Sequence, residues 1–138
     1  MRNYIVLLIA LTLFSCTARE EVIEKSFPNG NKQIVLVYEG KDDERKLMEQ
    51  KGYYVTGQLE VTGQFDENKK RTGNWVYYYE NGVKWSECEY INGLRDGKSI
   101  TYYEDGTKRY EGTFALEKQT GHWTFYKPDG SIQDEKDY

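Results

Sequence analysis

The chain has 138 residues and a formal net charge of −4, which argues against a nucleic-acid-binding surface because such a surface presents a basic face. Thirteen tyrosines and 13 glycines beside only two prolines favour many short strands joined by tight turns. Hydrophobic residues make up 38% of the chain, so we expect one domain built as a thin sheet rather than around a thick globular core.

The N-terminal segment has the order of a secretory signal peptide. A short basic start, Met1-Arg2-Asn3, is followed by an apolar run from Tyr4 to Phe14. This run is too short for a permanent transmembrane helix, which needs about 20 residues. We therefore predict that residues 1–15 are a signal peptide that is removed from the mature protein.

Cys16 ends a sequence that resembles the lipobox of bacterial lipoproteins, with Ser15 directly before it and a leucine three residues before it. The resemblance implies cleavage before Cys16, lipidation of its thiol and new amino group, and firm membrane attachment through residues 16–22 as a tether. Phe14 departs from the small residue usual at its position, so a plain signal peptide followed by a chance cysteine is the alternative. Thr17 is not the aspartate that retains lipoproteins at the inner membrane, so the outer membrane is favoured, on its periplasmic or its surface face.

A unit of 24 residues recurs through the rest of the chain. Residues 75–82, 99–106 and 123–130 align at this period without a gap, and each ends in glycine. A fixed period of this length predicts small supersecondary units that stack on one another. We predict a repeat domain over residues 23–138, with units at about 23–49, 50–74, 75–98 and 99–122 and a half-repeat at 123–138.

The turns that end in these glycines indicate hairpins of one kind. Pro28-Asn29-Gly30 and Pro128-Asp129-Gly130 place a proline two residues before the glycine. A two-residue turn would need a backbone N–H from that proline, which has none. We therefore predict three-residue loops with glycine in the left-handed conformation, where it makes a bulge.

The loop length sets the pairing register, and the register sets the two faces of the sheet. Pairing Tyr79 with Val83 predicts a buried row of alternate residues. Its members are Val76, Tyr78, Ser86, Cys88 and Tyr90, then Ile100, Tyr102, Tyr110, Gly112 and Phe114. Polar residues such as Ser99 and Thr101 are predicted on the other face.

The same register predicts an aromatic strip on the face opposite the buried row. Aromatic side chains are enriched where proteins bind partners, so we treat this strip as a candidate binding site. Its members are Trp75, Tyr77, Trp85, Tyr103, Trp123 and Phe125, with Tyr79 beside them. In the alternative interpretation, neighbouring repeats or residues 17–49 cover the strip.

Few residues could carry chemistry. His122 is the single histidine, which makes no catalytic or metal-binding cluster, and we interpret it as a variable turn residue. Cys88 shares a column with Gly63 and Gly112 that requires a small side chain, so we interpret it as buried rather than reactive. Asp42-Asp43-Glu44 lacks the spacing of a calcium loop and predicts a solvated insertion. The sequence therefore predicts no catalytic residue, no metal site and no cofactor.

The repeat pattern resembles a known family. Tyr78-Tyr79-Glu80-Asn81-Gly82 and the later segment Asn92-Gly93-Leu94-Arg95-Asp96-Gly97-Lys98 resemble the bacterial MORN-repeat variants, including YwqK-type proteins that carry an antitoxin label. The likeness covers residues 50–138 well and 23–49 loosely. It implies an all-β fold, an elongated single-layer antiparallel meander of repeated β-hairpins.

These features favour a lipid-anchored extracytoplasmic interaction module that binds an envelope protein or a polysaccharide, and no nucleic acid. A structural spacer of the cell envelope without a dedicated ligand is the second hypothesis. An antitoxin-like component is the third, although an exported protein fits poorly with neutralising a cytosolic toxin. Because titratable residues do not cluster, the sequence does not favour an enzyme.

Overall fold

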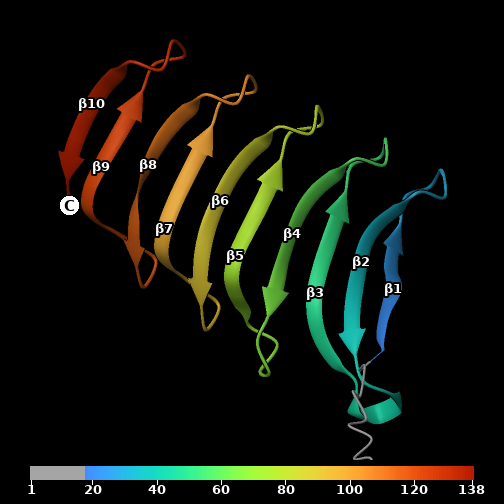
Figure 1. Ribbon diagram of the computed structural model, residues 1–138. Coiled ribbons are helices and arrows are strands. Elements are labelled where there is room, and N and C mark those ends of the chain that lie inside the picture. Colours follow the sequence, from blue (N-terminus) through green and yellow to red (C-terminus); the bar gives the residue numbers. More distant parts are fainter. Residues whose placement is uncertain (1–17) are drawn as a thin grey trace, which may run out of the picture.

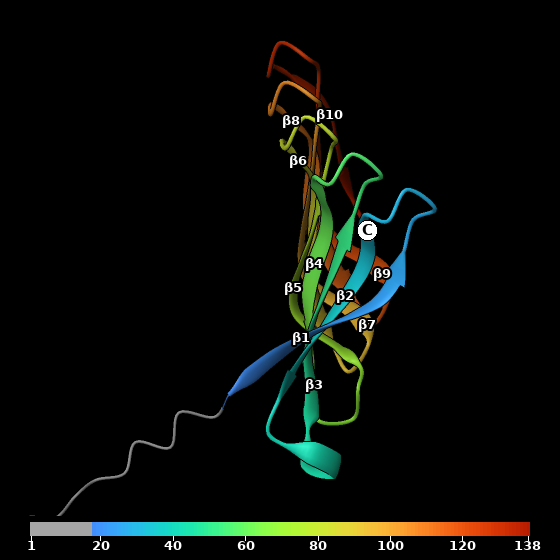
Figure 2. The ribbon, with the colours of Figure 1, turned by 90° about the vertical axis from the view of Figure 1, so that its right-hand side faces the viewer.

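The computed structural model describes residues 18–138, and the predicted signal peptide and Cys16 lie outside the described residues. Ten strands form one antiparallel sheet in which each strand pairs with the next in chain order (Figure 1). Viewed from the side, the described part of the chain is a thin, twisted layer (Figure 2). The predicted all-β fold, a single-layer meander of hairpins, is confirmed.

The strands have these bounds: β1 Arg19–Ser26, β2 Lys32–Glu39, β3 Lys46–Tyr53, β4 Leu59–Phe65, β5 Arg71–Tyr78, β6 Lys84–Ile91, β7 Leu94–Tyr102, β8 Lys108–Ala115, β9 Lys118–Tyr126 and β10 Ile132–Asp137. β1 begins inside the segment predicted as a tether, so the sheet starts before residue 23. The acidic insertion forms a short 3-10 helix, η1 (Asp42–Glu44), with exposed residues. Within residues 18–138, no helix has the length and apolar character needed to cross a bilayer.

The predicted three-residue loops lie side by side at one end of the strands. At the β5–β6 turn, the Tyr79 N–H donates to the Val83 carbonyl at 2.8 Å, and the Gly82 N–H donates to the Tyr79 carbonyl at 2.9 Å. Gly82 has a φ of 84°, a left-handed conformation that glycine adopts at little steric cost. The same pair of bonds closes the loops that end at Gly30, Gly57, Gly106 and Gly130. The predicted turn type and the Tyr79–Val83 pairing are confirmed.

A second bulge follows each of these loops, and the sequence did not predict it. On β6, Ser86 pairs with Tyr77 and Lys84 pairs with Tyr78, so Trp85 is an extra residue. The equivalent extra residues after the other loops are Gln33, Glu60, Arg109 and Gln133. One extra residue moves every side chain beyond it to the other side of the sheet relative to its partner strand.

The predicted assignment of the faces is therefore half wrong. Cys88 pairs with Trp75, and both lie on what we call the aromatic face, whereas Val76 pairs with Glu87 on the opposite, polar face. Four residues of the predicted buried row lie on the polar face: Val76, Tyr78, Ile100 and Tyr102. Ser99 and Thr101, predicted on the polar side, are buried on the aromatic face with exposed fractions of 6% and 4%.

Each of the two buried tryptophans lies over a glycine of the preceding strand. Trp75 is 0% exposed and Trp123 is 1% exposed. A Cβ atom on Gly63 would lie 2.1 Å from the Trp75 ring, and one on Gly112 would lie 2.1 Å from the Trp123 ring, so a larger residue does not fit. Each indole N–H donates to the backbone carbonyl of the residue after that glycine, at 3.1 and 3.2 Å.

Aromatic rings of the adjacent strands complete the cover of both tryptophans. Each indole receives two edge-on contacts, from Phe65 and Tyr90 at Trp75 and from Phe114 and Tyr138 at Trp123. Neighbouring strands therefore bury these indoles, as the alternative interpretation expected. The first strands, β1 to β3, extend the sheet and do not fold back over it.

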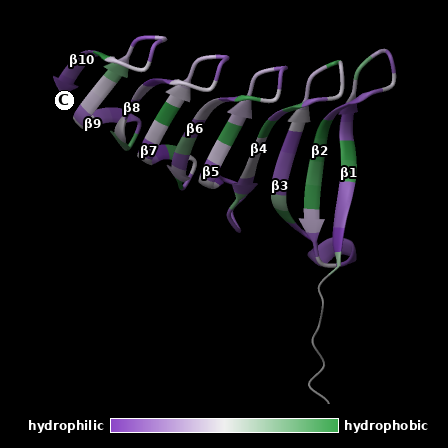
Figure 3. Cartoon of the chain, turned by 45° about the horizontal axis from the view of Figure 1, so that its top comes forward, coloured by the Kyte–Doolittle hydropathy of each residue, from purple (hydrophilic) through white to green (hydrophobic). Residues whose placement is uncertain are grey.

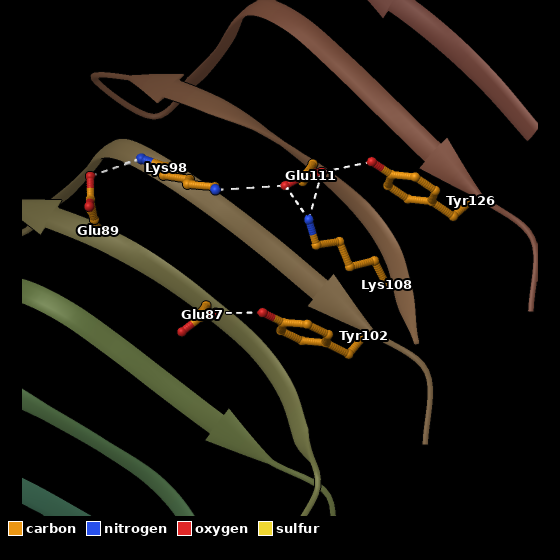
Figure 4. A network of polar contacts seen from close by, with 7 residues as sticks. All are labelled: Glu87, Glu89, Lys98, Tyr102, Lys108, Glu111 and Tyr126. Atoms are coloured by element: carbon orange, nitrogen blue, oxygen red, sulfur yellow. Dashed lines mark hydrogen bonds and ion pairs between the residues drawn. The ribbon is translucent and has the colours of Figure 1, made fainter. Parts of the chain in front are cut away.

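On the polar face, carboxylates bridge adjacent strands with the same geometry in two repeats (Figure 4). The Tyr102 hydroxyl donates to Glu87 at 2.6 Å, and the Tyr126 hydroxyl donates to Glu111 at 2.7 Å. The hydrogen bond from Lys108 holds the pKa of Glu111 below its ordinary value. Burial, followed by the bond to Glu87, raises the pKa of Tyr102 to about 12.

Tyrosine hydroxyls also join successive hairpins at the loop edge. Tyr54, Tyr79 and Tyr103 each precede a three-residue loop, and each donates to a backbone carbonyl of the next hairpin at 2.7 to 2.9 Å. A hydrogen bond of this kind stabilises a fold by about 0.5–1.5 kcal/mol. The hydroxyls of Tyr79 and Tyr103, both assigned to the predicted strip, therefore hold one repeat against the next.

The second strand and the last strand of the sheet differ in hydropathy (Figure 3). β2 is largely apolar, and its Val35 and Val37 are buried. Every residue of β10 is exposed, and most of them are charged. Charges on an edge strand hinder pairing with another chain, so β10 has the character of a polar cap.

His122 lies within β9, which corrects its predicted place in a turn. Its ring links β9 to β10, with Nδ1 at 2.8 Å from Asp137 and Nε2 at 3.1 Å from Glu135. These hydrogen bonds, the one to Asp137 first, raise the pKa of His122 above its ordinary value. The protonated ring is therefore the form that holds the terminal strand.

Gly112→Ala is expected to destabilise the sheet by about 1–3 kcal/mol, because its methyl group overpacks against Trp123. In a Trp123→Ala background the same change should cost little, because the clash is absent. Chemical denaturation of the four members of this cycle measures both values. Equal costs in the two backgrounds would contradict the stacking of Trp123 on Gly112.

The attachment of β10 should depend on pH through His122. Because its folded-state pKa is raised above the unfolded value of about 6.5, the contribution to stability is complete below that pH and is lost as pH rises through the folded-state pKa. We expect thermal unfolding to separate wild type from His122→Gln at about pH 5.5 and to bring them together at about pH 8.5. A difference that does not change with pH would refute this link.

Candidate binding groove

A groove of about 810 Å³ lies on the aromatic face, between β5 and β9. Volumes of this size are typical of ligand sites. Its aromatic lining consists of Tyr77, Trp85, Tyr90, Tyr110, Phe114, Trp123 and Phe125. Its other lining residues are Ser86, Cys88, Arg95, Ser99, Glu117 and Gln119. The groove thus combines apolar rings with polar groups that could orient a ligand.

The groove exists because the middle repeat lacks large side chains that its neighbours carry. At the 24-residue period, Ser99 stands in the column of Trp75 and Trp123. Two residues later in each repeat, the equivalent positions hold Tyr77, Thr101 and Phe125. The buried Ser99 on β7 therefore lines a low floor between taller aromatic side chains on β5 and β9, and Thr101 on the same strand is also small and buried.

Trp85 is the most accessible aromatic side chain of the groove. It is the extra residue of the bulge on β6, and 44% of it is exposed. Its ring contacts Tyr77 edge-on, with the centroids 5.9 Å apart. Tyr110 and Phe125 contact each other on the other side of the groove, with centroids 6.0 Å apart. An exposed indole beside a hollow is a common feature of binding surfaces.

An ion pair lies at the other end of the groove. Arg95 Nε lies 2.7 Å from Glu117 Oε2, and the Arg95 guanidinium lies 4.2 Å from the centroid of the Phe114 ring. Hydrogen bonds from Arg95, first from its backbone and then from its side chain, hold the pKa of Glu117 below its ordinary value. Leu116 and Glu117 form a two-residue turn with φ of 47° and 71°, and the hydrogen bonds to Arg95 offset the strain of this turn.

The six predicted binding residues separate into three groups. Trp75 and Trp123 are buried, as the alternative interpretation expected, and Trp123 lies at the wall of the groove. Tyr77, Trp85 and Phe125 line the groove. Tyr103 instead lines a second hollow of about 540 Å³, which shares Tyr110 and Phe125 with the groove.

The sequence pattern did not indicate the polar part of the site. Ser86, Arg95, Ser99, Glu117 and Gln119 were not candidates. A signal was available for Ser99, because it interrupts a column that holds tryptophan in the repeats on either side. Arg95 lies at the start of β7, and Glu117 lies in the turn between β8 and β9. The distance between them in the sequence does not match the repeat period, so their pairing was not predicted.

Cys88 lies on the floor and is 6% exposed, which confirms the predicted buried place. Burial raises the pKa of its thiol and so disfavours the reactive thiolate. Within the part of the chain that the structure describes, no three His, Cys, Asp or Glu side chains are grouped to hold a metal ion.

Two segments of the chain that contribute strands to the groove match a known family. Residues 71–92, which hold β5 and β6, and residues 95–115, which hold β8 and nearly all of β7, match the family described as MORN repeat variant. A comparison with curated proteins found no match. The MORN repeat variant family is not an enzyme family. Over these two segments, and in its sheet of hairpins, the chain is similar to MORN-repeat proteins.

Proposed function

We propose that this protein is a membrane-anchored extracytoplasmic lipoprotein whose repeat sheet is an interaction module for a protein or a glycan. The anchor rests on the lipobox-like sequence at Cys16 and the signal-peptide order of residues 1–15. We place the anchor in the outer membrane because Thr17 differs from the inner-membrane retention residue.

The groove on the aromatic face is the observation that carries this proposal. A single-layer sheet has two faces, and the polar face is largely occupied by side-chain networks such as those of Glu87 and Glu111. The aromatic face instead combines an exposed indole, Trp85, with a hollow of about 810 Å³. Exposed aromatic rings beside a concavity favour binding over a purely structural role.

The groove chemistry favours binding rather than catalysis. The Arg95 guanidinium and the Glu117 carboxylate pair with each other, and the Cys88 thiol has a raised pKa. The histidine, His122, pairs with β10 and does not line the groove. These groups do not form a nucleophile with an adjacent base.

A spacer without a dedicated ligand is the second candidate function. The observation in its favour is the repeated linkage of successive hairpins through Tyr54, Tyr79 and Tyr103, which would stiffen an elongated sheet. The antitoxin-like role is the least favoured, because the proposed export would separate the protein from a cytosolic toxin.

Replacing Trp85 and Tyr77 with serine should abolish crosslinks between the groove and its partner in native envelopes, because both rings line the hollow. Crosslinking followed by mass spectrometry on the membrane-bound protein measures this loss. Val55→Ser is the matched control, because Val55 is 49% exposed in a loop outside the groove. Crosslinks that persist in the double variant, or that disappear equally in the control, would refute a binding role for the groove.

Cys16→Ser should release the protein from membranes, because the acyl chains would have no attachment site. Fractionation of cells that express wild type or the variant, with detection of lipid on the wild-type protein by mass spectrometry, measures this change. Thr17→Ser is the control and should stay in the membrane fraction. Unchanged membrane association of Cys16→Ser would exclude a lipid anchor at this residue.

A further inference from the structure

We propose that the centre of the groove is a receptor for one aromatic side chain, preferentially an indole, of a partner protein. This inference rests on the proposed binding function and names the chemistry that the groove recognises. Its basis is that the protein contains the same receptor twice more, each time filled by a tryptophan of its own chain.

We call the surroundings of Trp75 and those of Trp123 the filled cages, and the two have a common construction. Trp75 lies over Gly63, receives the edges of Phe65 and Tyr90, and has the Arg71 guanidinium 4.2 Å from its ring. Trp123 lies over Gly112 and receives the edges of Phe114 and Tyr138. In both cages the indole N–H donates to the carbonyl after the glycine.

The middle repeat has the cage without the indole. Shifted by one repeat, the two rings are Tyr90 and Phe114, the cation is Arg95, and the small residue below is Cys88. All four line the groove, together with Ser99, which stands where the neighbouring repeats have tryptophan. We call these five residues the open cage.

The hydrogen-bond acceptor for an indole is also present. The carbonyl of Glu89 follows Cys88 as the two acceptor carbonyls follow their glycines. It receives the Cys88 thiol at 3.6 Å, and a thiol is a weak donor. An incoming indole N–H can replace this contact with a stronger one.

The charge and the ring geometry of the open cage select an aromatic side chain. Arg95 pairs with Glu117 and the floor residues are uncharged, so the cage complements an uncharged group. The aromatic rings of Tyr90 and Phe114 and the guanidinium of Arg95 are suited to contact with a π system, which a sugar ring lacks. The cage is also continuous with the tryptophan-filled cages on both sides, so an inserted indole would extend an existing packing pattern.

The probe is a short uncharged peptide with one tryptophan, compared with the same peptide carrying leucine. We expect the tryptophan peptide to shift NMR signals of Ser99, Phe114 and Gln119 in the full-length chain in detergent micelles. The leucine peptide should bind about tenfold more weakly, because it lacks the aromatic edge contacts and the N–H donor.

The double variant Cys88→Gly with Ser99→Trp supplies the missing indole from the chain itself. It should fold like the flanking repeats and lose peptide binding, whereas the control Val55→Ser, at an exposed loop residue outside the groove, should retain it. If the double variant does not fold, Trp85→Ala gives a second test, because Trp85 is a partly exposed wall residue and its loss should weaken binding by about tenfold.

Several results would overturn the inference. They are no binding of the tryptophan peptide, equal binding of both peptides, and unchanged binding to the filled variant. Binding of neutral oligosaccharides at Ser99 in place of the peptide would assign the groove to a glycan, and a dimer lost in the filled variant would assign it to a second copy. In these last two cases the inference fails but the proposed binding function stands. The absence of any crosslink between the groove of the wild-type protein and a partner in native envelopes would refute both.

Discussion

The structure depends on one contact, an indole ring that lies flat over a glycine of the preceding strand. A single-layer sheet has no second layer to bury its side chains, so large apolar groups must be buried by their own neighbours on the same face. Gly63 and Gly112 allow Trp75 and Trp123 to approach the backbone, and rings from the adjacent strands cover the indole edges. Each such cage spans three consecutive strands, so it also binds one hairpin to the next.

The polar face complements this packing with hydrogen bonds. The Tyr102–Glu87 and Tyr126–Glu111 pairs repeat at the period of the sequence and cross between adjacent strands. They show how a chain with 30% charged residues can hold a thin sheet together. One face is stabilised by aromatic packing and the other by partly buried carboxylates, and the stability of both is distributed along the array rather than concentrated in one core.

The fold and the turns could be predicted from the sequence because they follow from local features of the chain. The 24-residue period, the loop glycines and the two prolines are enough to predict hairpins with three-residue loops. The faces were not predictable in the same way, because the bulge at Trp85 has no glycine or proline to mark it, and one extra residue reverses the alternation. The groove was not predicted for a related reason. It arises where one repeat departs from the pattern of its neighbours, at Ser99 and Thr101. The Arg95–Glu117 pair depends on the path of two separate loops and could be found only in three dimensions.

The three indole N–H groups test this account most directly, because they report the register and the cages together. Hydrogen exchange followed by NMR should show two slowly exchanging indole signals, from Trp75 and Trp123, whose rings are buried and whose N–H groups donate to backbone carbonyls. The Trp85 signal should exchange rapidly, because its ring is partly exposed. Rapid exchange at Trp75 and Trp123 would place both indoles in solvent and would contradict the cages, the bulged register and the open cage between them.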